Sequence, residues 1–221
     1  MDICPKDKCT GCYACVNACN RGCISMQEDE LGCMHPVVDE TNCVNCGLCK
    51  SSCPNNVVLR FAYPSKCYAS WIDDKEKRKI CASGGIGTCM SEYVIKHGGV
   101  VFGSKYDAEM TPIMTYTEKI EELENFKGSR YVQSLVGNDT YKKVRTFLRN
   151  GRLVLFVGTP CQVAGLKTFL RKDYDNLITV DLICHGVCPT KYLKEEVAYL
   201  TEKYLSLIHI SEPTRRSYIS Y

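Results

Sequence analysis

Hydrophobic and polar residues follow two different patterns along the chain, and the pattern changes near residue 62. Before that point the hydrophobic runs are short, and residues 24–26 and 36–39 predict two short strands on either side of an acidic turn. After it, apolar runs of strand length alternate with segments of helical periodicity. The pattern predicts a small α+β part followed by an α/β part.

The second part contains three apolar runs that are suitable for buried strands, at residues 100–103, 152–158 and 177–183. Helices are expected over residues 82–99, 117–126, 139–151 and 162–170, and again from Thr190 onward. Strands that alternate with helices indicate a mainly parallel sheet with helices covering its faces.

Composition excludes several classes of protein. The chain has 221 residues, which suit one ordinary domain and a small one, and 45% of them are hydrophobic. Lys and Arg number 28 against 25 Asp and Glu, and basic residues gather only in short clusters such as residues 75–79, so nucleic-acid binding has little support. No apolar run could span a membrane and no leader is evident, so we expect a cytoplasmic protein.

Cysteine is the one residue type whose frequency is unusual: the chain has 17. The number is odd and the residues are clustered, which argues against the disulfide framework of a secreted protein. Metal binding explains them better.

Two segments of the first part repeat one another, "CTGCYACVNACN" and "CVNCGLCKSSCP". Both have the spacing C-x2-C-x2-C-x3-C that bacterial two-cluster ferredoxins use. Three cysteines of each run fit one cubane, and the fourth faces away and binds the other cluster. The spacing therefore predicts two [4Fe–4S] clusters, one held by Cys9, Cys12, Cys15 and Cys53 and one held by Cys43, Cys46, Cys49 and Cys19.

The alternative for these eight cysteines is a pair of Cys4 zinc sites. Zinc modules usually combine two separated CxxC pairs, whereas each run here adds a third thiol after two more residues. The duplicated run favours iron–sulfur clusters. The cysteines outside the quartets are expected to fill apolar space: Cys4, Cys23, Cys33, Cys67, Cys81 and Cys89.

Cys161 is isolated in the segment "FVGTPCQVAG", just after a predicted strand. From the residues alone it could be a nucleophile, a packing residue or one ligand of a site whose other ligands lie elsewhere. A further segment, "GGIGTC", lacks the third glycine and the preceding strand of a dinucleotide fingerprint. Ser83 is instead expected to cap a helix, and free backbone N–H groups there could also hold a phosphate.

Several ordered motifs of the second part together resemble the beta subunit of coenzyme F420 hydrogenase/dehydrogenase. They include "CYASWIDDKEKRKICASGGIGT", "GVVFGSKYD", "FKGSRYVQS", "VLFVGTPCQVAGLKTFL" and "NLITVDLICHGVCPTKY". The resemblance covers residues 63 to about 204, and an N-terminal ferredoxin module is a common fusion in bacterial members. It implies an iron–sulfur flavoprotein that binds FAD and passes electrons between clusters and a bound acceptor.

The resemblance also implies roles for particular residues. Ser83, Gly84 and Gly85 would cradle part of the FAD, and the loop "GSRYVQS" with the lysine before it would line the flavin through Lys127, Ser129, Arg130, Tyr131 and Gln133. The alternative is that this segment is only a connecting loop. In the family, the thiols of GTPCQ and CHGV belong to a further [4Fe–4S] site, to which Cys161 and Cys184 correspond, while Cys188 is expected to be a bystander.

The segment 205–221, "LSLIHISEPTRRSYISY", resembles a translated sequencing adapter and is expected to be foreign to the protein. We therefore expect a ferredoxin domain at residues 1–61 and a truncated flavin domain at 62–204, and the ligands that complete the third cluster would lie beyond the cut. The truncated chain itself is expected to be inactive.

These features predict an oxidoreductase that moves electrons between two clusters, FAD and a two-electron acceptor such as coenzyme F420 or another small substrate. Its partner would be a redox protein or a small-molecule acceptor. The alternatives are an electron carrier without its own substrate and an accessory protein of polysaccharide biosynthesis.

Overall fold

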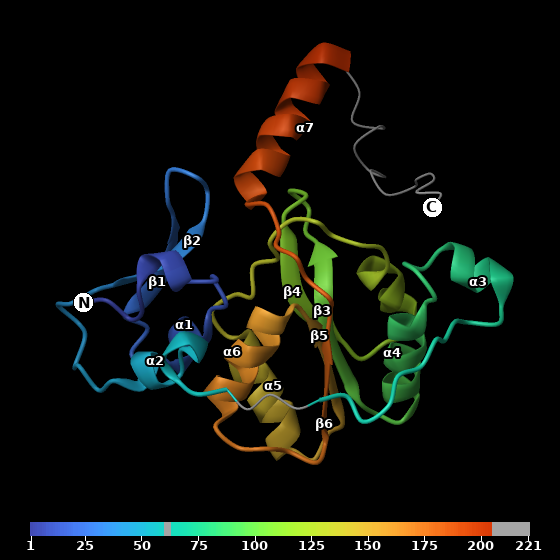
Figure 1. Cartoon of the computed structure of the whole chain (residues 1–221), viewed down its shortest axis with the longest axis horizontal. Coiled ribbons are helices and arrows are strands. Elements are labelled where there is room, and N and C mark those ends of the chain that lie inside the picture. The colour runs from blue at the N-terminus through green and yellow to red at the C-terminus, as the bar shows by residue number, and fades with distance from the viewer. Residues whose placement is uncertain (60–62, 205–221) are drawn as a thin grey trace.

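The computed structural model of the chain describes residues 1–59 and 63–204 (Figure 1). A small cysteine-rich part lies on one side of a larger part that is built on a sheet. The predicted domain boundary at residues 61 and 62 and the predicted foreign segment 205–221 lie outside the described residues.

The small part is built around a β-hairpin and short helices. Strands β1 (Ile24–Glu28) and β2 (Met34–Val38) pair antiparallel, with Met26 opposite Pro36. The helices are α1 (Ala14–Ala18), α2 (Leu48–Ser51) and the 3-10 turns η1 (Lys6–Lys8) and η2 (Pro54–Asn56). The two expected strands are therefore present, and the cysteine runs form the loops and short helices beside them.

The larger part contains a four-stranded sheet with the order β4-β3-β5-β6. The strands are β3 (Val100–Tyr106), β4 (Pro112–Thr117), β5 (Val154–Gly158) and β6 (Leu177–Asp181). β3, β5 and β6 are parallel, and only the edge strand β4 is antiparallel. The predicted fold class, an α+β part followed by a mainly parallel α/β part, is confirmed.

Four predicted helices are present, as α4 (Ile86–Lys96), α5 (Thr140–Arg149), α6 (Pro160–Leu170) and α7 (Thr190–Tyr204). A short helix, α3 (Lys75–Lys79), carries the basic cluster. The prediction that Ser83 caps α4 was wrong. Gly85 occupies the cap position with a φ of 77°, and no side chain bonds the free N–H groups there.

The helix predicted over residues 117–126 was also wrong. Thr117 ends β4, and only residues Glu121–Phe126 coil, as the 3-10 helix η3. The Thr117 hydroxyl accepts from the backbone N–H of Lys119 and donates to the carboxylate of Glu122. Such local side-chain bonds favour a turn over a regular helix at this point.

Successive side chains of β5 point to opposite faces of the sheet, so each face packs against different helices. Leu155 faces Val94 of α4 on one side. Val154 and Phe156 face α5 and α6 on the other side, in a cluster that continues without a break into α1 of the small part. The two parts of the chain therefore share one hydrophobic core.

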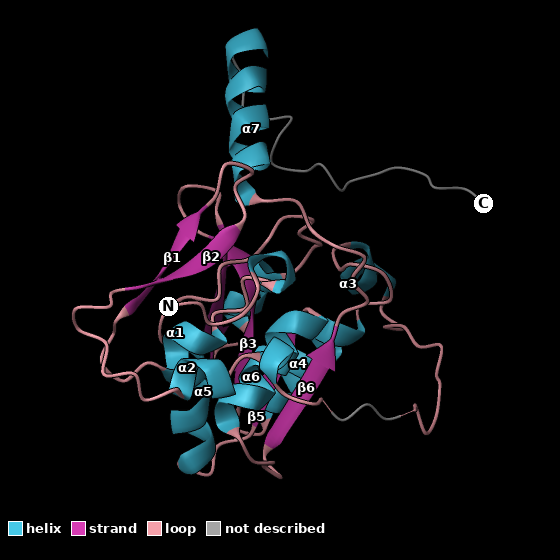
Figure 2. Ribbon diagram, turned by 60° about the vertical axis from the view of Figure 1, so that its left-hand side comes forward, coloured by secondary structure: helices cyan, strands magenta, loops and turns pink. Residues whose placement is uncertain are grey.

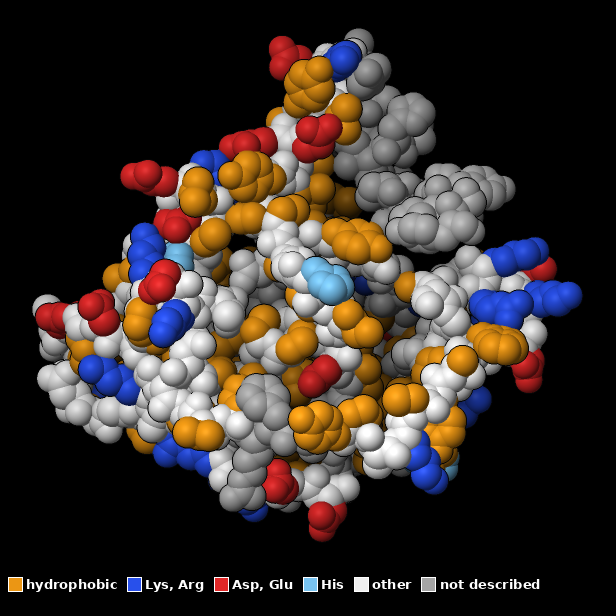
Figure 3. Space-filling model, viewed as in Figure 1, with side chains coloured by type: hydrophobic (Ala, Val, Ile, Leu, Met, Phe, Trp, Pro, Cys, Tyr) orange, Lys and Arg blue, Asp and Glu red, His pale blue; other side chains and the backbone are white. Residues whose placement is uncertain are grey.

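Helix α7 projects from the body of the molecule (Figure 2). Lys and Arg side chains gather over α3 at the margin of the face in Figure 3, whereas apolar side chains spread across its centre. Among the described residues, no helix is long and apolar enough to cross a membrane.

Candidate metal centres

The first candidate centre is a small cavity, of about 20 Å³, in the small part. Its lining includes the four cysteines that the sequence assigns to the first cluster, Cys9, Cys12, Cys15 and Cys53. The cavity is lined by the loop of the first cysteine run and by Cys53, the residue directly before η2. The fold thus brings the last cysteine of the second run to the first run.

The thiols of this cavity are close enough to influence one another. Cys15 interacts electrostatically with Cys12, Cys9 and Cys53, in addition to the desolvation that is the main cause of its raised pKa. Burial likewise raises the pKa of Cys12 to about 11. Buried, mutually repelling thiolates are unfavourable without a cation, so this donor set fits a cluster that supplies positive charge.

In the second candidate centre, the last cysteine of the first run lies near cysteines of the second run. Cys49 interacts with Cys43 of its own run and with Cys19, the last cysteine of the first run. The fourth predicted ligand, Cys46, is exposed on the same loop. The structure therefore brings together members of both predicted quartets in the crossed arrangement.

Backbone N–H groups point at some of the thiols. The amide of Cys23 donates to the Cys19 sulfur at 3.4 Å, and the amide of Asn45 donates to the Cys43 sulfur at the same distance. Burial alone would raise the pKa of Cys19, but bonds from the backbone of Cys23, Arg21 and Gly22 lower it. These donors stabilise the negative charge that a cluster ligand carries.

The first centre is attached to the α/β part by a buried tyrosine. Tyr141 of α5 is completely inaccessible to solvent, and its hydroxyl lies 2.8 Å from the carbonyl oxygen of Cys12 and 2.9 Å from that of Gln162 in α6. Its backbone N–H donates to the side chain of Asn17 in α1, whose amide donates in turn to the carbonyl of Gly137. The cysteine loop, α1, α5 and α6 thus meet at one buried group.

Helix α6 also approaches the Cys12 thiol directly. A Cβ atom placed on Gly165 would lie 3.1 Å from the Cys12 sulfur, so any larger residue would require the Cys12 side chain to shift by a few tenths of an ångström. Cys161 lies four residues earlier, on the same face of the helix, and interacts with Cys12 electrostatically. Thr159 and Gln162 form a capping box that fixes the start of α6 at Pro160.

Polar bonds complete this interface on either side of the core. The Thr168 hydroxyl donates to the carbonyl of Ser52 at 2.6 Å, and Arg171 donates to the Ser51 hydroxyl at 2.7 Å. The Gln133 side chain donates to the carbonyl of Thr10 at 3.1 Å. Both cysteine runs are therefore held against the α/β part.

The structure places Cys161 and Cys184 at the same edge of the sheet. β5 and β6 are parallel, Gly158 pairs with Asp181, and each thiol follows its strand by three residues. Cys161 is half-buried, whereas Cys184 is exposed. The carboxyl edge is where open α/β sheets bind ligands, and Cys161 additionally adjoins the first centre.

The predicted flavin cradle does not match the glycines that were to form it. A Cβ on Gly84 would lie 2.5 Å from the carbonyl oxygen of Ser70, and one on Gly85 would lie 2.5 Å from the Ile72 side chain. The backbone N–H of Ile72 also donates to the Gly84 carbonyl at 2.8 Å. These glycines therefore allow the chain to approach itself closely, and the space beside them is filled.

The remaining flavin candidates are also engaged elsewhere or point outward. The Arg130 guanidinium donates to four carbonyl oxygens of its own loop, including that of Asn125 at 2.7 Å. Lys127 pairs with Glu124, and Gln133 bonds Thr10. Tyr131 is 71% exposed and Ser129 is also exposed. The eight predicted residues do not gather into a cradle for a flavin.

Sequence reasoning missed the residues that join the two parts. Tyr141 and Asn17 are 124 positions apart, and neither stands in a motif, so no local signal marks them. His35 is half-buried, and its ring nitrogen lies 3.1 Å from the carboxylate of Asp29. The polar residues at the turn of the β1–β2 hairpin could have suggested that bond.

Two known families match the chain, one in each of its two parts. Residues 8–57 match the family described as 4Fe-4S dicluster domain, and residues 151–212 match the family described as the C terminus of the coenzyme F420 hydrogenase/dehydrogenase beta subunit. Each match covers less than half of the chain. The resemblance drawn from the sequence motifs is confirmed, and the match of the first part to a dicluster domain supports two [4Fe–4S] clusters there. The second match overlaps the start of the segment predicted to be foreign.

A solved structure is also similar. It is a chain from the xenon-derivatised F420-reducing [NiFe] hydrogenase complex of Methanosarcina barkeri, with 22% identity and a TM-score of 0.48. The similarity covers 62% of this chain and 50% of that one, so the chain spans about half the length of the hydrogenase chain. No curated protein matches.

Proposed function

We propose that the chain is the iron–sulfur electron-transfer portion of an oxidoreductase of the F420 hydrogenase/dehydrogenase beta-subunit type. A [4Fe–4S] cluster moves one electron at a time, and the chain supplies the thiolates and the buried contacts around it. We assign Cys9, Cys12, Cys15 and Cys53 to the first cluster and Cys43, Cys46, Cys49 and Cys19 to the second.

One observation supports the proposal above the others: the first centre is buried against the α/β part, through Tyr141 and Gly165. Cys12 belongs at once to the cluster cavity and to the core that contains α5 and α6. The second centre lies farther out, with Cys46 exposed. The first centre is therefore the one that exchanges electrons with an acceptor at the carboxyl edge of the sheet, and the second faces an external redox partner.

Three acceptors are candidates within this proposal. FAD, coenzyme F420 and a further cluster at Cys161 and Cys184 are implied by the family. Among the described residues, the predicted flavin set does not support FAD. An electron carrier that has no bound acceptor of its own is the second candidate, and the exposed position of Cys46 suits it equally well.

The test uses the whole chain, reconstituted anaerobically with iron and sulfide, reduced by viologen radical and then freed of viologen before an acceptor is added. FAD and coenzyme F420 are offered separately as acceptors, and their reduction is followed by absorbance. Cys53→Ala removes a ligand of the first cluster and Cys19→Ala removes one of the second.

We expect Cys53→Ala to lower acceptor reduction to the background rate, whereas Cys19→Ala retains part of it, because the first centre adjoins the α/β part. Acceptor reduction that is equally fast in Cys53→Ala and in the unchanged chain would contradict the proposal. Reduction of neither acceptor by a chain with both clusters would favour the carrier.

A further inference from the structure

The cavity of the first cluster contains a fifth thiol. Cys4 lines it together with the four predicted ligands, and it interacts electrostatically with Cys53 and Cys9. The C-x2-C-x2-C-x3-C spacing leaves no place for this residue as a ligand, because two runs already supply eight thiolates for two cubanes. Cys4 also packs against the edge of the main hydrophobic core.

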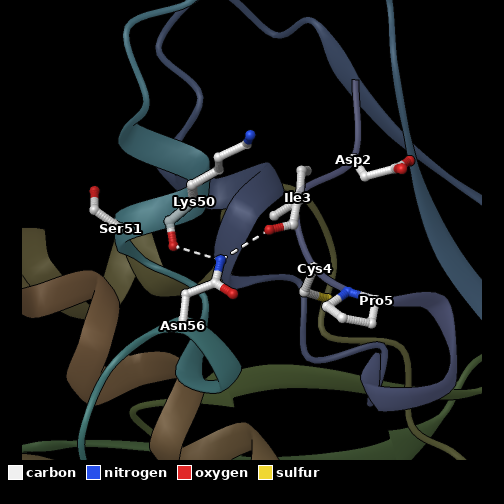
Figure 4. A pocket seen from close by; sticks show the side chains of 7 residues that line it. All are labelled: Asp2, Ile3, Cys4, Pro5, Lys50, Ser51 and Asn56. Atoms are coloured by element: carbon white, nitrogen blue, oxygen red, sulfur yellow. Dashed lines mark hydrogen bonds between the residues drawn. The ribbon is translucent and has the colours of Figure 1, made fainter.

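Cys4 also separates the cavity from solvent. On the outer side it lines an open pocket with Asp2, Ile3, Pro5 and Lys50 (Figure 4). Ile3 and Cys4 line both the pocket and the cavity, so they form the wall between them. A group in this wall touches the ligands of the first cluster while remaining near water.

The short helix η2 fixes this wall in place. Asn56 donates to the carbonyl of Ile3 at 2.8 Å and to that of Lys50 at 3.0 Å (Figure 4). Asn55 donates to the carbonyl of Lys8, next to Cys9, at 2.6 Å. Because η2 directly follows Cys53, the segment that supplies one ligand also holds Cys4 against it.

A thiol outside the quartets also lies near the second centre. Cys23 interacts with the predicted ligands Cys19 and Cys43, and its sulfur additionally donates to the carbonyl oxygen of Asn42 at 3.2 Å. Cys23 therefore has a backbone acceptor beside it, which the structure does not give for Cys4. Among the described cysteines outside the two quartets, Cys4 is the one that lines the cavity of the first cluster.

We propose that Cys4 is a positioning residue for electron transfer: its S–H donates a hydrogen bond to the Cys53 or Cys9 thiolate of the first cluster and raises the reduction potential of that cluster. Reduction adds a negative charge, and a donor to a ligand sulfur stabilises the more negative state. The inference rests on the proposed assignment of the first cluster but not on the identity of the acceptor.

The test is a potentiometric titration of the reconstituted whole chain, followed by electron paramagnetic resonance, with the iron content measured in parallel. Cys4→Ala removes the donor, Cys4→Ser retains one, and Cys4→Val fills the volume without a donor in case the alanine leaves too large a hole. Cys33→Ala is the matched control, because Cys33 is half-buried in the same part but does not line the cavity.

We expect Cys4→Ala and Cys4→Val to keep about eight irons, as two cubanes require. At a fixed potential near the midpoint, the ratio of reduced to oxidised first cluster should fall about tenfold, which is about 59 mV for one electron. Cys4→Ser and Cys33→Ala should leave this ratio near that of the unchanged chain.

Two results would overturn the inference. A midpoint that is the same in Cys4→Ala, Cys4→Val and Cys33→Ala would show that Cys4 only fills space. A loss of about four irons in Cys4→Ala, with Cys53→Ala retaining both clusters, would make Cys4 a ligand instead. Neither result depends on acceptor reduction, so failure here is distinguishable from failure of the proposed function.

Discussion

At the scale of single residues, the hydroxyl of Tyr141 is the most consequential group that joins the two parts. It lies within hydrogen-bond distance of the buried carbonyl oxygens of Cys12 and Gln162, which belong to different parts of the chain. Burial raises the pKa of Tyr141 well above its ordinary value, so the group stays a neutral donor. No water reaches this position, because the side chain is completely buried.

Replacing Tyr141 by phenylalanine should therefore leave two buried carbonyl oxygens without this donor. The expected loss is about 1–3 kcal/mol of the free energy of unfolding. Denaturant unfolding of the apo chain measures it, and Tyr93→Phe is the control because Tyr93 is 57% exposed on α4. Equal stability of the two variants would mean that the Tyr141 hydroxyl contributes nothing to the attachment.

At the scale of elements, the sequence of α6 both fixes where the helix starts and lets its backbone approach the first cluster site. The segment Thr159-Pro160-Cys161-Gln162 starts the helix at the end of β5, through a capping box and a proline in the first turn. Four residues after Cys161, Gly165 then lets the helix backbone approach the Cys12 thiol. Glycine inside a helix costs about 1 kcal/mol relative to alanine, so its presence here reflects the close contact.

A valine at Gly165 should disturb this contact. Gly165→Val would force the Cys12 loop and Tyr141 away, at an expected cost of about 1–3 kcal/mol in the free energy of unfolding. It should also lower the iron content of the first cluster. The matched control is Gly87→Val in α4, where the added atoms meet open space and stability should change by about 0.5 kcal/mol or less.

The outcome is read from iron content and chemical unfolding measured side by side. Full occupancy of the first cluster in Gly165→Val, with unfolding like that of Gly87→Val, would show that α6 does not position Cys12. Loss of the second cluster instead of the first would contradict the crossed assignment of the ligands.

At the scale of the whole molecule, the small part and the sheet form one body. The hydrophobic cluster that contains Phe102 and Phe156 of the sheet also contains Val16 of α1 and the cluster cysteines Cys12 and Cys15. We therefore propose that the predicted division into a ferredoxin domain and an α/β domain does not correspond to two units that fold independently.

Removal of the clusters should consequently affect the complete chain. Treating the reconstituted protein with an iron chelator should lower the midpoint of one cooperative thermal transition, because metal binding contributes to the stability of everything that folds with it. Near-ultraviolet circular dichroism and calorimetry should report the same midpoint. A separate, early transition that involves only the cysteine-rich part, while the sheet melts unchanged, would contradict a shared core.

The sequence by itself determined the features that depend on local spacing. The duplicated cysteine runs predict two cubanes because ligand geometry demands those intervals. The buried strands β3, β5 and β6 are visible as apolar runs, because strands covered on both faces are apolar at nearly every position. Edge strand β4 was missed, since its alternating residues and initial proline give a weak signal.

Contacts between residues that are distant in the sequence could be seen only in the tertiary structure. Nothing in the motif around Ser83, Gly84 and Gly85 shows that residues 70–72 fill the space beside it. Nothing near Cys4 in the sequence shows that it lines the cavity of the first cluster. Contacts such as Tyr141 with Cys12 join residues 129 positions apart. They arise when separate apolar faces are buried together, and that packing depends on the shapes of all the elements at once.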